Sequence, residues 1–453
     1  MESPDRILLR SSPVEDTTPE MGLVLGHALA MDYKTVVISR DLMRSSTMMK
    51  EALVAGLTAS GADVIDLGCT SAPVAAMMAK MGDCAVYITE YREYGLVSGY
   101  ILLNSNGSLF RKDQIRHLDK IFTEKPELPD YRHLGTVRCY NYATEEYNHK
   151  LLSVLTAEAG CSMILDCNCG VAADSAPQIL NAINADVISI NAQRDRNFIN
   201  RSLSPTETEL RDIRQFIEKD LGTIGIALNR IGTLATVLDE SGHIIDNDVV
   251  LALMMIFLKP TKVVVPEDIS SLVEDAFYGR IETEMVTPFE RAEDAEIQFI
   301  RTLPDAGAIC DAVANTNADI GYYDGGFIFK DLSMMNDGIY AAAVVAQMAS
   351  KNSLKQIIDA LPEYYSDCKT YHYECTAEEF SRVMDEAVNN LKGATVECNR
   401  GWRVQMDGGW FIIYFDKEQE NTVYVKCESN DKAYLIGLIE ISGDLVESCS
   451  MGQ

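Results

Sequence analysis

The chain has 453 residues, of which 68 are acidic and 39 are basic, so its formal net charge at pH 7 is −29. Nucleic acids and anionic membrane surfaces are bound through a basic face, and the sequence has no basic run, so neither is an expected partner. A long apolar run and a basic-then-apolar leader are both absent, which predicts a cytoplasmic protein without a membrane span.

The first recognisable unit, residues 35–68, alternates a strand, a helix and a second strand. The apolar run Val36–Ser39 predicts the first strand, a helix is expected from about Thr47 to Ser60, and Val64–Leu67 predicts the second strand. Gly61 suits the end of the helix. The order predicts a right-handed parallel crossover. Four residues of the intervening loop are expected to cap its helix: Arg40, Asp41, Ser45 and Ser46.

A polar loop follows the next buried strand, Val86–Thr89, and precedes an apolar hairpin arm, Tyr100–Leu103. Loops at the carboxyl ends of strands usually carry the chemistry of α/β proteins. This loop offers no serine, cysteine or histidine nucleophile. Its side chains belong to Glu90, Tyr91, Arg92, Glu93 and Tyr94.

The strand–helix–strand pattern recurs at residues 162–191 and again from residue 262, where a strand at Ala295–Thr302 completes it. Two helix starts are also predicted, each with proline in the first turn. These are Thr18-Pro19, and Ser204-Pro205 before TELRDIRQFIEKDLG.

The segment after residue 366 changes character, because alternating strands and a turn at Asp407-Gly408-Gly409 predict an α+β unit. The predicted fold class is therefore α/β: three related α/β/α domains with mixed, largely parallel sheets, and a C-terminal α+β domain. The expected domains are residues 1–148, 149–257, 258–365 and 366–453. The twelve cysteines are spread too widely for a disulfide framework or a common metal site, and are expected to be buried free thiols.

Several segments together resemble the α-D-phosphohexomutases, the family of phosphoglucomutase, phosphomannomutase and phosphoglucosamine mutase. ISRDLMRSS (38–46) is similar to the family's G-R-D-x-R-x-S-S. LDCNCGVAADS (165–175) is similar to V-D-C-G-N-G-A-G-S, and FINRSLSPTETEL (198–210) to F-P-G-R-N-P-E-P-T-P-E. The resemblance spans the whole chain and implies four domains around one central cleft.

In this family four loops carry the chemistry. A serine in T-A-S-H-N-P carries the phosphoryl group, and three aspartates in D-G-D-A-D-R hold Mg²⁺. A G-E-x-S-G-H loop contacts sugar hydroxyls, and an R-x-S-G-T-E-P loop binds phosphate.

The residues at the matching positions differ in all four loops. Between Thr89 and Gly99, Tyr91 stands at the serine position and Arg92 at the following histidine position. The three aspartate positions hold Asn229, Ile231 and Thr233, with Arg230 among them, so the Mg²⁺ site is expected to be lost and no cofactor is predicted. Tyr322, Tyr323 and Asp324 occupy the sugar loop, and Tyr414 and Asp416 stand in the phosphate loop.

The resemblance therefore implies a non-catalytic paralogue in carbohydrate metabolism, with a binding or regulatory role. Its expected partners are a sugar or sugar phosphate, further copies of itself, or an active mutase. The alternatives are a diverged intramolecular phosphotransferase or other sugar-phosphate enzyme with a relocated site, and an inert scaffold. The expected ligand-binding residues are Glu90, Glu93, Arg230, Tyr322, Tyr323, Asp324, Tyr414 and Asp416, with Tyr91 and Arg92 at the former catalytic positions.

Overall fold

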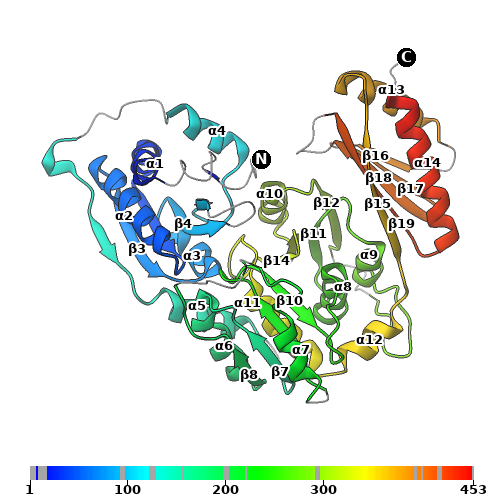
Figure 1. Ribbon diagram of the computed structural model, residues 1–453, viewed down its shortest axis with the longest axis horizontal. Coiled ribbons are helices and arrows are strands. Elements are labelled where there is room, and N and C mark those ends of the chain that lie inside the picture. Colours follow the sequence, from blue (N-terminus) through cyan, green and yellow to red (C-terminus); the bar gives the residue numbers. More distant parts are fainter. Residues whose placement is uncertain are drawn as a thin grey trace.

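The computed structural model describes the chain apart from residues 1–6, 9–17, 92–96, 122–128, 156–157, 197–201, 203, 220–221, 291–295, 392–394, 399–400, 416–420 and 451–453. In this described part the strands form four sheets that follow one another along the chain. Figure 1 shows the first and fourth sheets at the two ends of an arc, with the other two between them. None of the described helices is long and apolar enough to cross a membrane.

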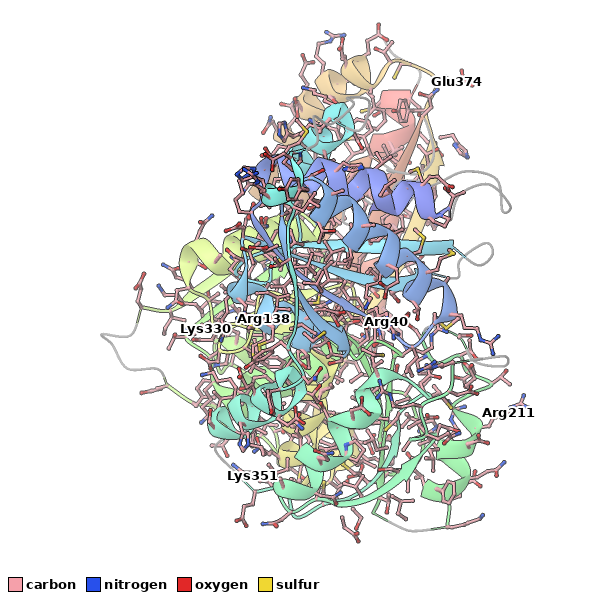
Figure 2. The ribbon with its side chains drawn as sticks, turned by 90° about the vertical axis from the view of Figure 1, so that its left-hand side faces the viewer. Arg40, Arg138, Arg211, Lys330, Lys351 and Glu374 are labelled. Carbon is pink, nitrogen blue, oxygen red and sulfur yellow. The ribbon has the colours of Figure 1, made fainter. Side chains whose placement is uncertain are left out.

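The first sheet has the strand order β1-β5-β4-β2-β3-β6, in which β4, β2, β3 and β6 run parallel. Helices α1 and α2 lie side by side (Figure 2). Glycine permits this close approach, because a Cβ on Gly56 would lie 2.1 Å from the Leu23 carbonyl oxygen. The elements are β1 Ile7–Leu8, α1 Pro19–Asp32, β2 Thr35–Arg40, α2 Arg44–Ala59, β3 Asp63–Cys69, α3 Ala72–Met78, β4 Cys84–Tyr91, β5 Val97–Asn104, α4 Lys112–Ile121 and β6 Val137–Cys139.

The second and third sheets repeat a parallel core with one antiparallel edge strand. Their orders are β10-β9-β7-β8 and β12-β11-β13-β14. The elements of the second are α5 Ala143–Val154, β7 Ser162–Asp166, α6 Ala176–Ala182, β8 Asp186–Ile190, α7 Arg211–Ile217, β9 Ile224–Leu228 and β10 Ala235–Leu238. Those of the third are α8 Asn247–Leu258, β11 Lys262–Pro266, α9 Ser271–Phe277, β12 Gln298–Thr302, α10 Ala306–Thr316, β13 Ile320–Tyr323, β14 Gly326–Phe329, α11 Gly338–Ala349 and α12 Leu354–Ala360.

The fourth sheet is antiparallel throughout, with the order β15-β19-β18-β17-β16. Its elements are β15 Tyr365–His372, α13 Ala377–Asn389, β16 Thr395–Cys398, β17 Gly401–Met406, β18 Gly409–Phe415, β19 Thr422–Ser429 and α14 Lys432–Ser450. The predicted fold class, three α/β units and a C-terminal α+β unit, is thus confirmed. The predicted boundaries at 148 and 257 fall within helices α5 and α8.

Two predicted helix starts are wrong. Helix α2 begins at Arg44, and its N-cap residue, Met43, makes no side-chain capping hydrogen bond. The Asp41 carboxylate accepts hydrogen bonds from the Met43 N–H (2.9 Å) and the Thr89 hydroxyl (2.7 Å). Helix α7 begins at Arg211 rather than after Ser204, because the Glu209 carboxylate holds the preceding residues in a turn by accepting from the N–H and hydroxyl of Thr206.

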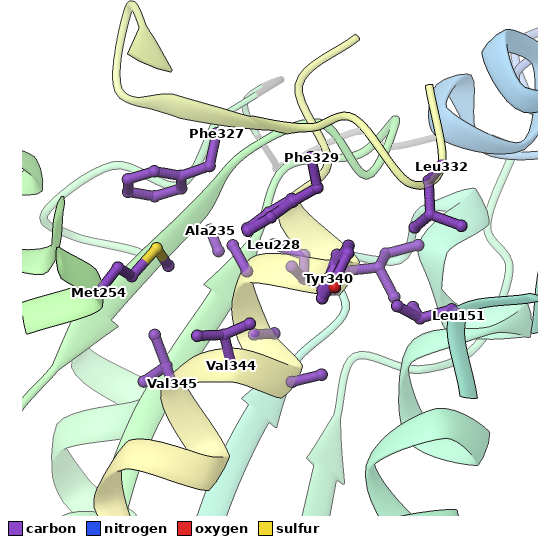
Figure 3. Close-up of a cluster of buried hydrophobic side chains, with 14 of the residues drawn as sticks. Leu151, Leu228, Ala235, Met254, Phe327, Phe329, Leu332, Tyr340, Val344 and Val345 are labelled. Atoms are coloured by element: carbon purple, nitrogen blue, oxygen red, sulfur yellow. The ribbon is translucent and has the colours of Figure 1, made fainter. Parts of the chain in front are cut away.

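Helix α11 forms the centre of the largest hydrophobic core. Every residue from Gly338 to Met348 is buried, as expected for a helix that is apolar on all sides. Figure 3 shows Tyr340, Val344 and Val345 of α11 among side chains from the second and third sheets. The Tyr340 ring stacks on Phe329 with 4.0 Å between centroids. The described cysteines are free thiols, and most are buried, as expected from the sequence.

A buried carboxylate caps α11 and links the third unit to α5. Asp337 is 1% exposed, and it accepts hydrogen bonds from the Tyr147 hydroxyl (2.8 Å to each carboxylate oxygen) and from the N–H groups of Ile339 and Tyr340. Burial raises its pKa from the usual 3.8 to about 6, against the lowering effect of these donors. The folded protein therefore binds this proton more tightly than the unfolded chain does.

Because of this carboxyl group, we expect the difference in stability between the wild type and a variant without it to depend on pH. A raised pKa contributes stability that is full below about pH 4 and is lost as the pH rises through about 6. Asp337→Asn removes the titration, so the free energy of unfolding of the wild type relative to this variant should fall by about 2 kcal/mol from pH 4 to pH 7. Urea unfolding of both proteins across this range measures it, and parallel pH profiles would contradict it.

Candidate functional site

The carboxyl ends of the strands in the first sheet hold the first group of predicted residues. Strand β4 ends at Tyr91, where the backbone of Glu90 pairs with Ser98 and that of Tyr91 with Val97. The positions of Arg92 and Glu93 lie outside the described residues, as does Asp416 in the fourth unit. Tyr414 lies near the end of β18, where its ring packs against Tyr424 with 5.0 Å between centroids.

The turn between β9 and β10 is closed by its own side chains. Asn229 Oδ1 accepts hydrogen bonds from the N–H groups of Thr233 (2.8 Å) and Leu234 (3.2 Å), and Asn229 Nδ2 donates to the Thr233 hydroxyl (2.8 Å). Ile231 is 2% exposed and belongs to the largest hydrophobic core. The turn thus satisfies its own polar groups and points its central side chain into the core.

Arg230, in the same turn, is buried between the first two units. It is 2% exposed, and its Nη1 lies 3.7 Å from the Met43 sulfur. Its carbonyl oxygen accepts a hydrogen bond from the Val171 N–H (3.1 Å), and Gly170 permits this contact because a Cβ there would lie 2.3 Å from the same oxygen. A fixed guanidinium charge therefore stands within this turn.

These residues do not fit Mg²⁺. The ion prefers carboxylate oxygens in near-ideal octahedral geometry. The turn offers one amide, already bonded within the turn, beside a buried isoleucine and a cation. No group of three or more His, Cys, Asp or Glu side chains that could hold a metal occurs among the described residues.

A cavity of about 440 Å³ lies in the third unit, where the β11 and β13 strands end and β19 of the fourth unit approaches. It brings together Tyr322, Tyr323 and Asp324, which the sequence had placed in one loop. Arg230 is not among its lining residues. The others are Asp248, Pro266, Asp268, Ile269, Pro304, Gly325 and Lys426.

Hydrogen bonds hold the polar wall of this cavity. The Tyr322 hydroxyl donates to Asp248 Oδ1 (3.0 Å), the Ser270 N–H donates to Asp248 Oδ2 (3.3 Å), and Lys426 Nζ donates to the Asp268 carbonyl oxygen (2.8 Å). Burial raises the pKa of Asp248 to about 6, and burial next to this carboxylate raises the pKa of Tyr322 above its usual value. The cavity can thus bind a ligand through carboxylates, hydroxyls and one ammonium group.

Asp248, Asp268 and Lys426 were missed in the sequence. Asp268 follows strand β11, so its position at a strand end was an available signal. Asp248 stands in the first turn of α8, where acidic residues are common for helix stability alone. Lys426 comes from β19, more than 100 residues further along the chain, and only the tertiary structure brings it here.

The polar lining supplies acids, hydroxyls and an amine but no serine, cysteine or histidine. Side chains of this kind can hold the hydroxyl groups of a sugar by hydrogen bonding, and tyrosine rings can cover its apolar face.

Comparisons with known proteins agree with this architecture. The family model described as phosphoglucomutase/phosphomannomutase, alpha/beta/alpha domain I, matches residues 11–128. The chain is 27% identical over 411 residues to the probable phosphoglucosamine mutase of Methanosarcina barkeri, covering 89% of this chain and 90% of that one. It is 26% identical over 453 residues to the phosphoglucosamine mutase of Methanococcus aeolicus, covering 96% of each.

Solved structures show the same fold at lower identity. A phosphoglucomutase/phosphomannomutase family protein from Burkholderia thailandensis superposes with a TM-score of 0.77 at 18% identity, over 99% of this chain and 97% of that one. A putative phosphomannomutase from Thermus thermophilus gives a TM-score of 0.72 at 15% identity, over 99% and 100% of the two chains.

Proposed function

The chain belongs to the α-D-phosphohexomutase family, and from this premise we propose that it is a non-catalytic member that binds a sugar or a sugar phosphate. The binding would serve carbohydrate metabolism by sensing or regulation rather than by phosphoryl transfer.

The turn at residues 229–233 carries this proposal. Family members use three aspartates there to hold the Mg²⁺ that neutralises phosphoryl charge. In this chain Asn229 bonds within the turn, Ile231 packs in the core and Arg230 brings a fixed positive charge. A site closed by its own hydrogen bonds and by apolar packing cannot accept a hydrated divalent ion without local unfolding.

The cavity beside Tyr322 is the proposed ligand site. Asp268 and Asp324 line it together with two tyrosines, a combination that suits hydroxyl groups. The proposed orientation of the ligand directs sugar hydroxyls toward these carboxylates.

Catalysis by the same fold is the second candidate. Two curated relatives, from Methanosarcina barkeri and Methanococcus aeolicus, are named as a probable phosphoglucosamine mutase and a phosphoglucosamine mutase, and they match nearly the whole chain. An active site rebuilt from other residues would make this protein a phosphotransferase acting on a hexosamine phosphate or a related sugar phosphate.

The two candidates differ in whether the protein becomes phosphorylated. After incubation with glucose 1,6-bisphosphate and Mg²⁺, we expect the intact mass to be unchanged, whereas an active phosphohexomutase retains one phosphoryl group. Stoichiometric phosphorylation would overturn the proposal.

Binding is tested on the same preparation. Glucosamine, glucose and their 6-phosphates are screened by thermal unfolding, where a bound ligand raises the melting temperature. Asp324→Asn should weaken the response, since asparagine tolerates the positive φ of 49° at this turn and removes only the charge. Asp407→Asn, in the turn between β17 and β18, is the matched control. No response to any of these sugars would count against the ligand assignment.

A further inference from the structure

A second cavity lies on the other side of the third unit, between helices α8, α11 and α12 and the segment around Met285. Its volume is about 240 Å³. Helices α8 and α12 are seen at the lower right of Figure 1, and Figure 2 shows Lys351 near the lower edge of the molecule. Nothing in the proposed function uses this cavity.

The floor of the cavity is apolar. Four of its side chains are almost completely buried, with exposed fractions of 5% or less: Leu253, Val286, Met348 and Leu354. The remaining apolar residues in the lining are Ile256, Phe257, Met285 and Ile357. Methionine side chains adapt to ligands of different shape. Such a floor favours a hydrocarbon chain or ring.

Two lysines stand at the rim, and no acidic residue is among those that line the cavity. Lys259 Nζ lies 4.5 Å from the centroid of the Phe289 ring, and Lys351 Nζ lies 4.6 Å from that of Phe257. The cation–π contact with Phe257 holds the Lys351 ammonium group in place without neutralising it.

The backbone holds both sides of the opening. Lys259 adopts a left-handed conformation at the end of α8, and its N–H donates to the Met255 carbonyl oxygen. Across from it, the Thr283 hydroxyl accepts from the N–H groups of Met285 (3.2 Å) and Val286 (2.9 Å), and the Thr283 N–H donates back to the Val286 carbonyl oxygen (2.9 Å). This turn places Val286 in the cavity wall, so the pocket is largely preformed.

We propose that this cavity binds a small amphipathic anion, whose hydrocarbon part enters the apolar floor and whose carboxylate or phosphate group lies beside Lys351. The size agrees with this, because a cavity of about 150 Å³ in another protein holds benzene. A volume of about 240 Å³ admits one short acyl chain or a substituted ring.

The cavity is separate from the sugar site. Asp248 in the first turn of α8 lines the sugar cavity, and Lys259 at the other end of the helix lines this one. The two residues are eleven positions apart, which corresponds to about 16 Å along a helix. Binding at one site is therefore measurable without occupying the other.

Isothermal titration of the full chain with octanoate, octanol and acetate tests the proposal. We expect octanoate to bind about tenfold more tightly than octanol, since the charged group adds an interaction with Lys351, and acetate not to bind. Equal affinity for octanoate and octanol would overturn the anionic part of the proposal. No binding of octanoate at millimolar concentration would overturn it entirely.

Variants locate the binding. Lys351→Glu should lower the octanoate affinity about tenfold and leave octanol unchanged, and Lys351→Arg should retain both. Val286→Phe fills the cavity and should weaken both ligands. Lys219→Glu is the matched control, because Lys219 also lies over a phenylalanine ring, Phe216 at 5.7 Å, but does not line this cavity. Unchanged octanoate binding in both Lys351→Glu and Val286→Phe would place the ligand elsewhere and overturn the assignment.

A free acid and an anionic membrane lipid both combine a hydrocarbon chain with a negatively charged group. Sedimentation with vesicles distinguishes between these two possible ligands. With vesicles of phosphatidylcholine and phosphatidylglycerol we expect the protein to stay in the supernatant, because the volume fits a single short chain. Sedimentation that Lys351→Glu abolishes would overturn the assignment to a free acid.

Discussion

The purified protein should not measurably interconvert the 1- and 6-phosphates of glucose, mannose or glucosamine, with Mg²⁺ and a bisphosphate primer present. The side chain at the former serine position is Tyr91, and the metal turn holds Asn229, Ile231 and Thr233. Removing the nucleophile alone costs roughly 10⁶-fold in rate in a well-studied serine protease. Under the proposed function no Mg²⁺ is bound, which removes charge stabilisation as well, so the expected rate lies below detection.

The phosphoglucosamine mutase of Methanococcus aeolicus, which matches 96% of this chain, is the positive control for the assay. Tyr91→Ser should remain inactive, because it restores a hydroxyl of the right length but leaves Arg230 and the closed turn in place. Turnover by the wild type that survives further purification would show that the catalytic residues lie elsewhere. Activity gained by Tyr91→Ser alone would show that the turn still admits a metal.

Local patterns in the sequence were sufficient for most of the fold. Strand β2 at Thr35–Arg40 and strand β3 at Asp63–Cys69 each contain the predicted run. A short apolar segment bounded by turn residues is typical of a buried strand. The start of α7 was missed, because the turn that delays it depends on which of two acids near Thr206 accepts the hydrogen bonds. Propensity alone does not distinguish Glu207 from Glu209.

The candidate site was predictable only in part. Three lining residues of the cavity proposed as the ligand site, Tyr322, Tyr323 and Asp324, were expected to lie together because they are neighbours in the chain. Arg230 was expected to face a ligand, and its burial against Met43 depends on a contact between residues 187 positions apart. The apolar cavity could not be predicted either, because its lining comes from three helices and a turn that are each explained by ordinary core packing.

The junction between the third and fourth units was also not predicted from the sequence. It fixes the position of strand β18, which contains Tyr414. Trp410 is completely buried there, and its Nε1 donates to Glu428 Oε1 and to the Ser271 hydroxyl, each at 3.0 Å. Glu428 is 2% exposed, and it also accepts from the Ser271 N–H (2.7 Å). The Arg403 guanidinium lies 4.7 Å from the indole centroid.

Trp410→Ala should therefore lower the free energy of unfolding by about 3–5 kcal/mol, because it removes a large buried side chain and one donor to a buried carboxylate. Trp410→Phe keeps most of the packing and should cost only about 1–2 kcal/mol, for the lost N–H. The chain has two tryptophans, so in both variants Trp402 alone reports unfolding of the fourth unit by fluorescence in urea. An equal loss of unfolding free energy in the two variants would contradict this expectation. It would mean that the hydrogen bonds to Glu428 and Ser271, rather than the packing of the indole, hold the fourth unit beside the cavity lined by Lys426.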